Sequence, residues 1–252
     1  MPSIYDYPAI YDAIMRASTD QLALEADTIH ALLQKRQITN GRILEIASGT
    51  SPHGQSLSKA GHAVVGIDLS QSMISYMQNT DIPNTYIHAD LRAFTLQTEP
   101  FDCAIFMSET FPLITEYDDL VNHFSAVHRH LKKGGLYLID IDAQRKGYRH
   151  TNKTWGHQTV VMPDGHVEFW YEDHLSDWIE DINRLTMHTN IQTQTLKTTT
   201  TDNWKIRLYS PWTLSVLIRS LKNWHLHGFY SYRDQSPNIE NEDNYYMLIS
   251  TL

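Results

Sequence analysis

The sequence contains little cysteine and lacks any long hydrophobic run. Its single cysteine, Cys103, excludes an intramolecular disulfide and a cysteine-rich metal site. The apolar surroundings of this residue, FDCAIFM, indicate a buried structural thiol in a reducing compartment. No stretch of about eighteen apolar residues occurs, and the N-terminal MPSIYDYPAI lacks the basic flank and apolar segment of a signal peptide. We therefore expect a soluble cytoplasmic protein without a membrane span.

Basic residues are also scarce. Lysine and arginine total 20 against 29 aspartates and glutamates, which gives a formal charge of −9, and no basic block is present. A polyanion would be repelled, so neither nucleic acid nor an anionic membrane is an expected partner. With 252 residues, 41% of them hydrophobic, the chain can bury one sizeable core. We expect a single domain over residues 1–252 that carries an insertion.

The first 150 residues alternate apolar strands with amphipathic segments. This order predicts a parallel sheet wrapped by helices. A helix is expected over residues 21–35, and another from residue 117 that ends with Lys132 and Lys133 before Gly134. Strands are expected over residues 42–47, 63–68, 84–89, 101–107 and 135–142.

The pattern changes after residue 142. The turn signal PDG at residues 163–165 and alternating segments over 185–200 predict a small antiparallel sheet, inserted at about 150–208. SPWTLSVLIRSLKN then starts with a serine cap and a proline, which predicts a helix near 210–223 followed by two final strands. The insertion is rich in aromatic side chains, which we expect mainly to pack: Trp155, Phe169, Trp170, Tyr171, Trp178 and Trp204.

The segment ILEIASGTSPHG, residues 43–54, has the form of a nucleotide-binding strand, loop and helix start. A dinucleotide fingerprint would need glycines at Ala47, Gly49 and Pro52, of which only Gly49 is present. Pro52 cannot donate a backbone N–H to a phosphate, and no Gly-Lys-Ser/Thr follows. Asp68 ends the second strand about twenty residues later, as an acid that binds a ribose should. The loop therefore suits a ligand with a ribose but no pyrophosphate.

Several motifs in order carry a family resemblance: ILEIASGTSPHG, VVGIDLS, YIHADLRAF, FDCAIFMSE and LKKGGLYLIDI. Together they resemble the class I S-adenosylmethionine (SAM) dependent methyltransferases of small molecules over about residues 40–145. The resemblance implies an α/β, Rossmann-like fold with a mostly parallel seven-stranded sheet, helices on both faces and the inserted antiparallel sheet. It also implies SAM as cofactor, a SAM-binding core over residues 21–145, and methyl transfer to a small-molecule N, O or C acceptor.

The resemblance also assigns SAM-binding residues. The loop residues Glu45, Ala47, Gly49 and Thr50 would lie under the methionine part of SAM. The family has glycine where this chain has Ala47 and Ser51. The ribose and adenine contacts would be Asp68, Leu69, Met73, Asp90 and Leu91, and Met107 and Ser108 would close the pocket. Three alternatives stay open: Glu45 serves the loop backbone, Asp68 caps a helix, or Asp90 caps the next helix.

Methyl transfer needs positioning of the nucleophile more than a catalytic triad. Glu109 is the candidate base or ammonium anchor, with a solvated loop acid as the alternative. Tyr11 is the candidate catalytic and SAM-contacting aromatic of an N-terminal lid, residues 1–20, and the alternative is an amphipathic helix that uses Tyr11 for packing. Arg207 or Tyr209 could face a substrate carboxylate. No metal is expected, because the pairs among the 14 histidines lack a third ligand.

Two other functions remain open. Proteins with such a core can use SAM as the substrate itself, with the methionine amine closing on its own side chain to form azetidine-2-carboxylate and release methylthioadenosine. A non-catalytic SAM sensor is the other alternative. A homodimer is possible, and the sequence does not identify the acceptor.

Overall fold

The computed structural model describes residues 2–142, 153–177, 180–237 and 244–252. Seven strands form one sheet in the order β10-β11-β5-β4-β1-β2-β3. β1 to β5 run parallel, and β11 is antiparallel to both β5 and β10. The prediction of a mostly parallel seven-stranded sheet is confirmed. The strands are β1 Arg42–Ile46, β2 Ala63–Asp68, β3 Thr85–His88, β4 Phe101–Phe106, β5 Leu131–Asp142, β10 Trp224–Ser231 and β11 Asn244–Thr251.

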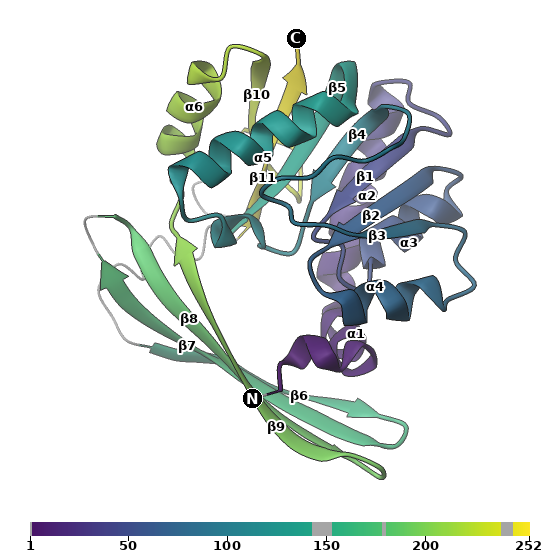
Figure 1. The fold of residues 1–252 in the computed structure, drawn as a ribbon, viewed down its shortest axis with the longest axis vertical. Helices are drawn as coiled ribbons and strands as arrows, with labels where there is room; N and C mark the ends of the chain where they lie inside the picture. The colour runs from purple at the N-terminus through teal and green to yellow at the C-terminus, as the bar shows by residue number, and fades with distance from the viewer. Residues whose placement is uncertain (1, 143–152, 178–179, 238–243) are drawn as a thin grey trace.

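Helices cover both faces of this sheet (Figure 1). On one face, apolar side chains of α5 (Tyr117–His130) and α6 (Pro211–Ser220) join the main hydrophobic cluster. On the other face, α2 (Thr19–Lys35) and α3 (Pro52–Lys59) contribute to a second cluster. α4 (Gln71–Gln78) packs on Tyr86 of β3. Across the described residues, no helix has the length and apolarity needed to cross a membrane.

The expected helix end at Gly134 is wrong. α5 ends at His130, and β5 already begins at Leu131, whose backbone is extended. Leu131 is buried and pairs with Phe101 of β4, so its apolar side chain draws the chain into the sheet before the two lysines. Lys132 then forms an ion pair with Asp102 at 2.6 Å rather than capping a helix.

The inserted antiparallel sheet is confirmed, in the order β6-β7-β8-β9. Its strands are β6 Lys153–Met162, β7 Gly165–Asp177, β8 Ile182–Thr193 and β9 Lys197–Arg207. The predicted PDG turn joins β6 to β7. Trp178, one of the aromatic residues named from the sequence, lies outside the described residues.

The N-terminal segment packs against this second sheet. It consists of the short 3₁₀ helix η1 (Ile4–Asp6) and the helix α1 (Pro8–Ala17). Ile4 and Ile14 are buried among Phe169, Met187 and neighbouring side chains of the sheet. Figure 1 shows α1 between the second sheet and α4. The first residues of the chain therefore fill the space between the two sheets.

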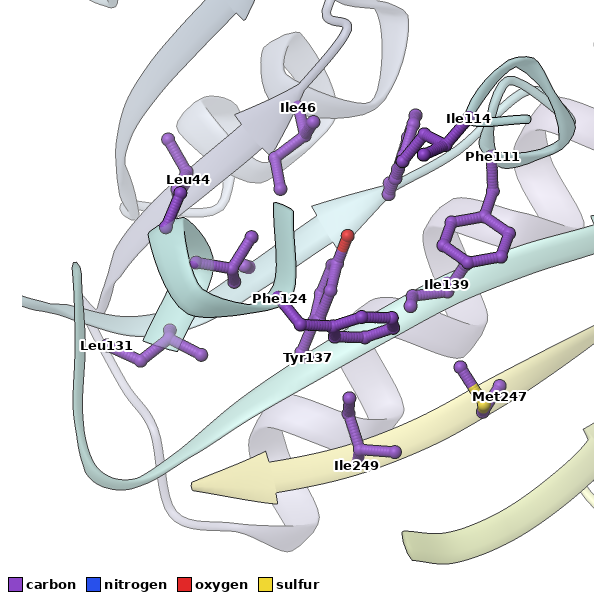
Figure 2. Close-up of a cluster of buried hydrophobic side chains, with 14 of the residues drawn as sticks. Leu44, Ile46, Phe111, Ile114, Phe124, Leu131, Tyr137, Ile139, Met247 and Ile249 are labelled. Carbon is purple, nitrogen blue, oxygen red and sulfur yellow. The ribbon is translucent and has the colours of Figure 1, made fainter. Parts of the chain in front are cut away.

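Phe124 of α5 lies at the centre of the main core (Figure 2). It is fully buried, and its ring contacts those of Phe111, Tyr137 and Trp224 edge to face, with centroids 5.9 to 6.2 Å apart. These residues come from η2 (Phe111–Leu113), β5 and β10, so Phe124 joins elements that are distant in sequence.

Replacing Phe124 with alanine should destabilise the protein by about 3–5 kcal/mol, because the cavity left behind adds to the lost burial. Urea denaturation followed by circular dichroism measures this loss. Tyr117→Ala is the control on the same helix, since Tyr117 is 64% exposed. The control should change stability by less than about 0.5 kcal/mol. Equal effects of the two substitutions would contradict this account of the core.

Candidate active site

The loop between β1 and α3 has an unusual backbone. Ala47, Gly49 and Ser51 all have positive φ angles, of 51°, 50° and 53°. Such a left-handed conformation costs a non-glycine residue about 1 kcal/mol or more. Ala47 and Ser51 stand where the family that the sequence resembles has glycine, and they adopt the backbone conformation that glycine favours. The loop thus has the turn expected from the resemblance despite its sparse glycines.

The Glu45 side chain stabilises this loop through hydrogen bonds. Its side chain is buried and accepts hydrogen bonds from the Ser51 hydroxyl and from the Gly54 backbone N–H, the latter at 3.1 Å. Burial raises the pKa of Glu45 above its ordinary value. A Cβ atom on Gly54 would collide with the Glu45 carboxylate and the Ser51 hydroxyl. These contacts favour the alternative in which Glu45 serves the loop itself.

Asp68, at the end of the neighbouring strand β2, binds the backbone of the same loop. Its carboxylate accepts the Gly49 N–H at 2.7 Å and the Ser70 N–H at 2.8 Å. Burial raises the pKa of Asp68, and these backbone hydrogen bonds partly offset the effect. The cap of α4 itself is the Ser70 hydroxyl, which accepts the Met73 N–H at 3.3 Å. Asp68 is therefore a loop acid rather than the side-chain cap of that helix.

The residues assigned to adenine occupy different environments. Leu69 is 58% exposed, Met73 is fully buried, and Leu91 packs half-buried on the main core. Asp90 forms an ion pair with Arg92 at 2.6 Å. No helix begins between β3 and β4, so the alternative that Asp90 caps the next helix is wrong. Asp90 instead accepts the Arg92 N–H at 2.9 Å in a turn.

A cavity of about 490 Å³ lies beyond the loop, between α1, α2, the turn after β4 and the second sheet. Tyr11, Ser108 and Glu109 are the predicted site residues that line it. Tyr171 and Trp204 line the side that belongs to the second sheet. A Cβ placed on Gly49 would lie 3.4 Å from the Tyr11 ring, so Tyr11 separates the loop from the cavity. Met107 is buried at the end of β4, directly before this turn.

The turn after β4 is strained. Ser108 and Glu109 are consecutive non-glycine residues with φ of 60° and 53°. The Glu109 N–H donates to the Asp140 carboxylate at 2.9 Å, which fixes this turn to the end of β5. Paired left-handed residues at a cavity wall are typical of functional sites.

A buried histidine and glutamate lie deeper, between α3 and α2. His53 Nε2 lies 2.7 Å from Glu25 Oε2, and both side chains are almost fully buried. The Glu25 partner raises the pKa of His53 against the opposing effect of burial. Gln21 donates to the same carboxylate at 2.7 Å, and Glu25 also lines the cavity.

Asp140 is a buried acid at the end of β5 that lines the cavity. Its side chain is 1% exposed, and the Tyr232 hydroxyl donates to it at 2.9 Å. Burial, together with the negative charge of nearby Glu25, raises the pKa of Asp140 to about 7. The Glu109 N–H, the Tyr232 hydroxyl and the charge of His53 act in the opposite direction.

Glu25, Asp140 and Tyr232 were not singled out as site residues from the sequence. A signal for Glu25 was present, because it shares the apolar stripe of its helix with Leu22 and Ile29 and so must be buried. Asp140 ends a buried strand at the carboxyl edge of the sheet, where open α/β sheets bind ligands. Tyr232 reaches the site only through the pairing of β10 and β11 beside β5.

Two other expectations are corrected. The Arg207 guanidinium donates to the Thr115 and Glu180 backbone oxygens at 2.7 and 2.5 Å. The Tyr209 hydroxyl donates to the Ile114 oxygen at 2.5 Å. Both residues therefore fix the chain after η2 to the second sheet and do not line the cavity. In the ranges the structure describes, no group of three metal-ligating side chains converges.

Asp140→Asn should stabilise the protein more at pH 8 than at pH 5. The raised pKa of Asp140 means that the folded state holds its proton more tightly than the unfolded chain. This stabilisation is complete below the unfolded pKa near 4 and is lost as pH rises to about 7. Asparagine stays neutral, so its advantage should grow by more than about 1 kcal/mol between the two pH values. Urea denaturation at both values measures it.

Asp81→Asn, at an exposed carboxylate, is the matched control for this experiment. It removes the same charge without touching the buried cluster. An Asp140→Asn advantage that is the same at both pH values would show that the carboxyl is not perturbed by burial.

Comparisons with known proteins agree with this arrangement. Residues 43–135 match a family model described as "Methyltransferase domain". A curated relative, the dTDP-4-amino-2,3,4,6-tetradeoxy-D-glucose N,N-dimethyltransferase of Saccharopolyspora spinosa, is 32% identical over 141 residues. That match covers 55% of this chain, and the chain spans only 56% of the relative's length.

Two solved structures share almost the whole fold. A SAM-dependent methyltransferase of Clostridium acetobutylicum has a TM-score of 0.79 at 19% identity, covering 97% of both chains. The sugar N-methyltransferase KedS8 of a Streptoalloteichus species has a TM-score of 0.75 at 18% identity, covering 94% of this chain and 92% of its own.

The fold is thus that of the Rossmann-like, class I methyltransferases, as the resemblance stated from the sequence implied. Residues 43–135, the part of the chain that holds β1 to β4, are similar in sequence to the methyltransferase domain.

Proposed function

We propose that the protein transfers a methyl group from SAM to an amine nitrogen of a small molecule. The observation that carries this proposal is the cavity of about 490 Å³ on the far side of Tyr11 from the loop and Asp68. Cyclisation of SAM itself needs no acceptor chamber. A cavity of this size, walled by a separate sheet, suits a second ligand.

The residues around the loop fit SAM. The Asp68 carboxylate has backbone N–H partners and would accept hydrogen bonds from the ribose hydroxyls. The Ser48 and Thr50 hydroxyls are buried, and neither has a hydrogen-bond partner in the described part of the chain. Such orphaned groups suit a polar ligand, here the methionine end of SAM. When bound, SAM supplies an activated methyl group on a sulfonium.

The chain's own contribution is orientation and exclusion of water. Tyr11, Tyr171 and Trp204 line the cavity with aromatic surface, which favours a dehydrated cation. Tyr11 lies at the junction between loop and cavity, so we place the methyl group beside its ring. The N-terminal segment would thus act as the proposed lid while its apolar face packs on the second sheet.

An amine acceptor is favoured by charge. Among the described residues, the charged side chains that line the cavity are three carboxylates, Glu25, Glu109 and Asp140, and one cation, Arg233. The relatives described above include an amino sugar N,N-dimethyltransferase and a sugar N-methyltransferase. The net charge of −9 supports a small molecule rather than nucleic acid. A homodimer and a location in the cytoplasm stay predictions.

Product analysis tests the proposal. The purified protein is incubated with SAM alone and then with amino, hydroxyl and carboxyl acceptors, and the nucleoside product is identified by mass spectrometry. We expect S-adenosylhomocysteine only with an amine. Methylthioadenosine from SAM alone would instead mean cyclisation or cleavage, and SAM binding without any product would mean a sensor.

Asp68→Asn should weaken SAM binding by about 30-fold, because hydrogen bonds to a charged acceptor are worth roughly 2 kcal/mol. Isothermal titration calorimetry with SAM measures this change. Asp81→Asn is the control, since Asp81 is an exposed acid before β3. Unchanged affinity in Asp68→Asn would remove Asp68 from the binding site.

A further inference from the structure

Asp140, Glu25 and Tyr232 line one part of the cavity, which is called the recess below. Asp140 closes it from the end of β5, Glu25 from α2 and Tyr232 from the segment after β10. Asp140 and Glu25 are 1% and 4% exposed, so neither carboxylate is balanced by bulk water. His53 pairs with Glu25 at 2.7 Å, and its charge also acts on Asp140. Among the described residues that line the cavity, three carboxylates stand against one cation, Arg233. The cavity side of the recess is thus negative.

The donors around Asp140 leave it able to accept a proton. The Glu109 N–H and the Tyr232 hydroxyl each donate one hydrogen bond to it, at 2.9 Å, to different oxygens. A carboxylate offers about four acceptor sites, so capacity remains on the side of the cavity. Burial and the charge of Glu25 raise its pKa to about 7, which is close to ideal for a base that works at neutral pH.

We propose that this recess binds the protonated amino group of the acceptor and that Asp140 takes its proton. The inference rests on the proposed function, because only an amine acceptor brings such a proton. The ammonium N–H bond breaks and its proton goes to an Asp140 oxygen. The freed nitrogen lone pair then forms the N–C bond as the methyl carbon leaves sulfur, which keeps the C–S electron pair. The products are a methylammonium and S-adenosylhomocysteine, and Asp140 returns its proton to water.

Glu25 and Tyr232 have different parts in this account. Glu25 adds negative charge that attracts the ammonium and keeps the proton affinity of Asp140 high. Tyr232 is a positioning residue, since its hydroxyl orients the carboxylate and stabilises the ionised form. Gln21, on α2, holds Glu25 in place from the cavity side. Arg233, Glu109 and Tyr171 also line the cavity, and Glu109 is held beside Asp140 by its backbone N–H.

Binding without turnover provides the first test. The probe is dTDP-4-amino-2,3,4,6-tetradeoxy-D-glucose, with its 4-hydroxy analogue as the uncharged comparison. Calorimetry uses the full chain saturated with S-adenosylhomocysteine at pH 8. We expect the amine to bind at least tenfold more tightly than the alcohol. Asp140→Asn and Glu25→Gln should each reduce that preference at least threefold, and Asp81→Asn should leave it unchanged. Equal binding of the two probes by the unaltered protein would overturn the proposal.

The second test is the pH dependence of kcat/KM with the same amine. Asp140→Asn should lower kcat/KM about 100-fold at pH 7 and less than tenfold at pH 9.5, where the free amine is abundant. Tyr232→Phe should shift the rise of activity to higher pH, because a hydrogen bond that stabilises the carboxylate is lost. An Asp140→Asn profile that matches the unaltered protein would refute the assignment of Asp140.

SAM itself carries an ammonium, so its affinity is measured for every variant. We expect Asp140→Asn to change SAM affinity by less than threefold. A loss of tenfold or more would mean that the recess holds the amino group of SAM, which overturns the assignment to the acceptor. Failure of the proposed function looks different, since no amine would then yield S-adenosylhomocysteine from the unaltered protein.

Discussion

The buried carboxylate of Glu45 is the constraint on which the loop and its surroundings depend. An ionised group removed from water needs donors, and here they are the Ser51 hydroxyl and the Gly54 N–H. To bring both back over the end of β1, the chain turns through left-handed residues at positions 47, 49 and 51. The same turn aims the Gly49 N–H at Asp68. One buried acid therefore sets the position of the next.

The N-terminal segment connects the loop after β1 to the second sheet. Asp202 of β9 accepts the Ser3 hydroxyl at 2.5 Å and the Ile4 N–H at 3.0 Å, which anchors η1 to the second sheet. Further along the same segment, the Tyr11 ring lies beside Gly49 of the loop, 3.4 Å from where a Cβ on Gly49 would stand. The sequence left two uses of the tyrosines open, as packing or as a cover. The position of Tyr11 is compatible with both uses. Its side chain packs between the two sheets and also lines the cavity there.

The main elements of the fold could be predicted from the sequence because the patterns that indicate them are local. Strand and helix alternation, the turn PDG and the serine cap at Ser210 each depend on residues next to one another. The prediction of where α5 ends was wrong because that end depends on a contact distant in sequence. Lys132, Lys133 and Gly134 have the local character of a helix end, but the pairing of Leu131 with Phe101 is a contact across the sheet that overrides it.

The site divides in the same way. Glu45, Gly49 and Asp68 belong to one continuous motif, and the structure brings them together as that motif predicts. Glu25, Asp140 and Tyr232 come from three separate parts of the chain. The sheet order β10-β11-β5 brings Tyr232 to Asp140, and the packing of α2 against the segment after β10 adds Glu25. Arg207 and Tyr209 were candidate substrate contacts because their side chains can bind a carboxylate. In the structure they donate hydrogen bonds to backbone oxygens after η2 instead.

The cluster formed by Glu25, His53, Glu45 and Asp140 explains how such a site stays folded. His53 is bonded to Glu25 and close enough to Glu45 for their charges to interact, so its positive charge offsets two acids. Burial and the charge of Glu25 outweigh the effect of His53 on Asp140, so the pKa of Asp140 is raised. A cation that enters the recess lowers the free energy of the ionised form of Asp140, and ionised Asp140 in turn binds the cation more tightly. Ionised Asp140 therefore destabilises the folded protein on its own. Binding of a positively charged ligand removes this electrostatic cost.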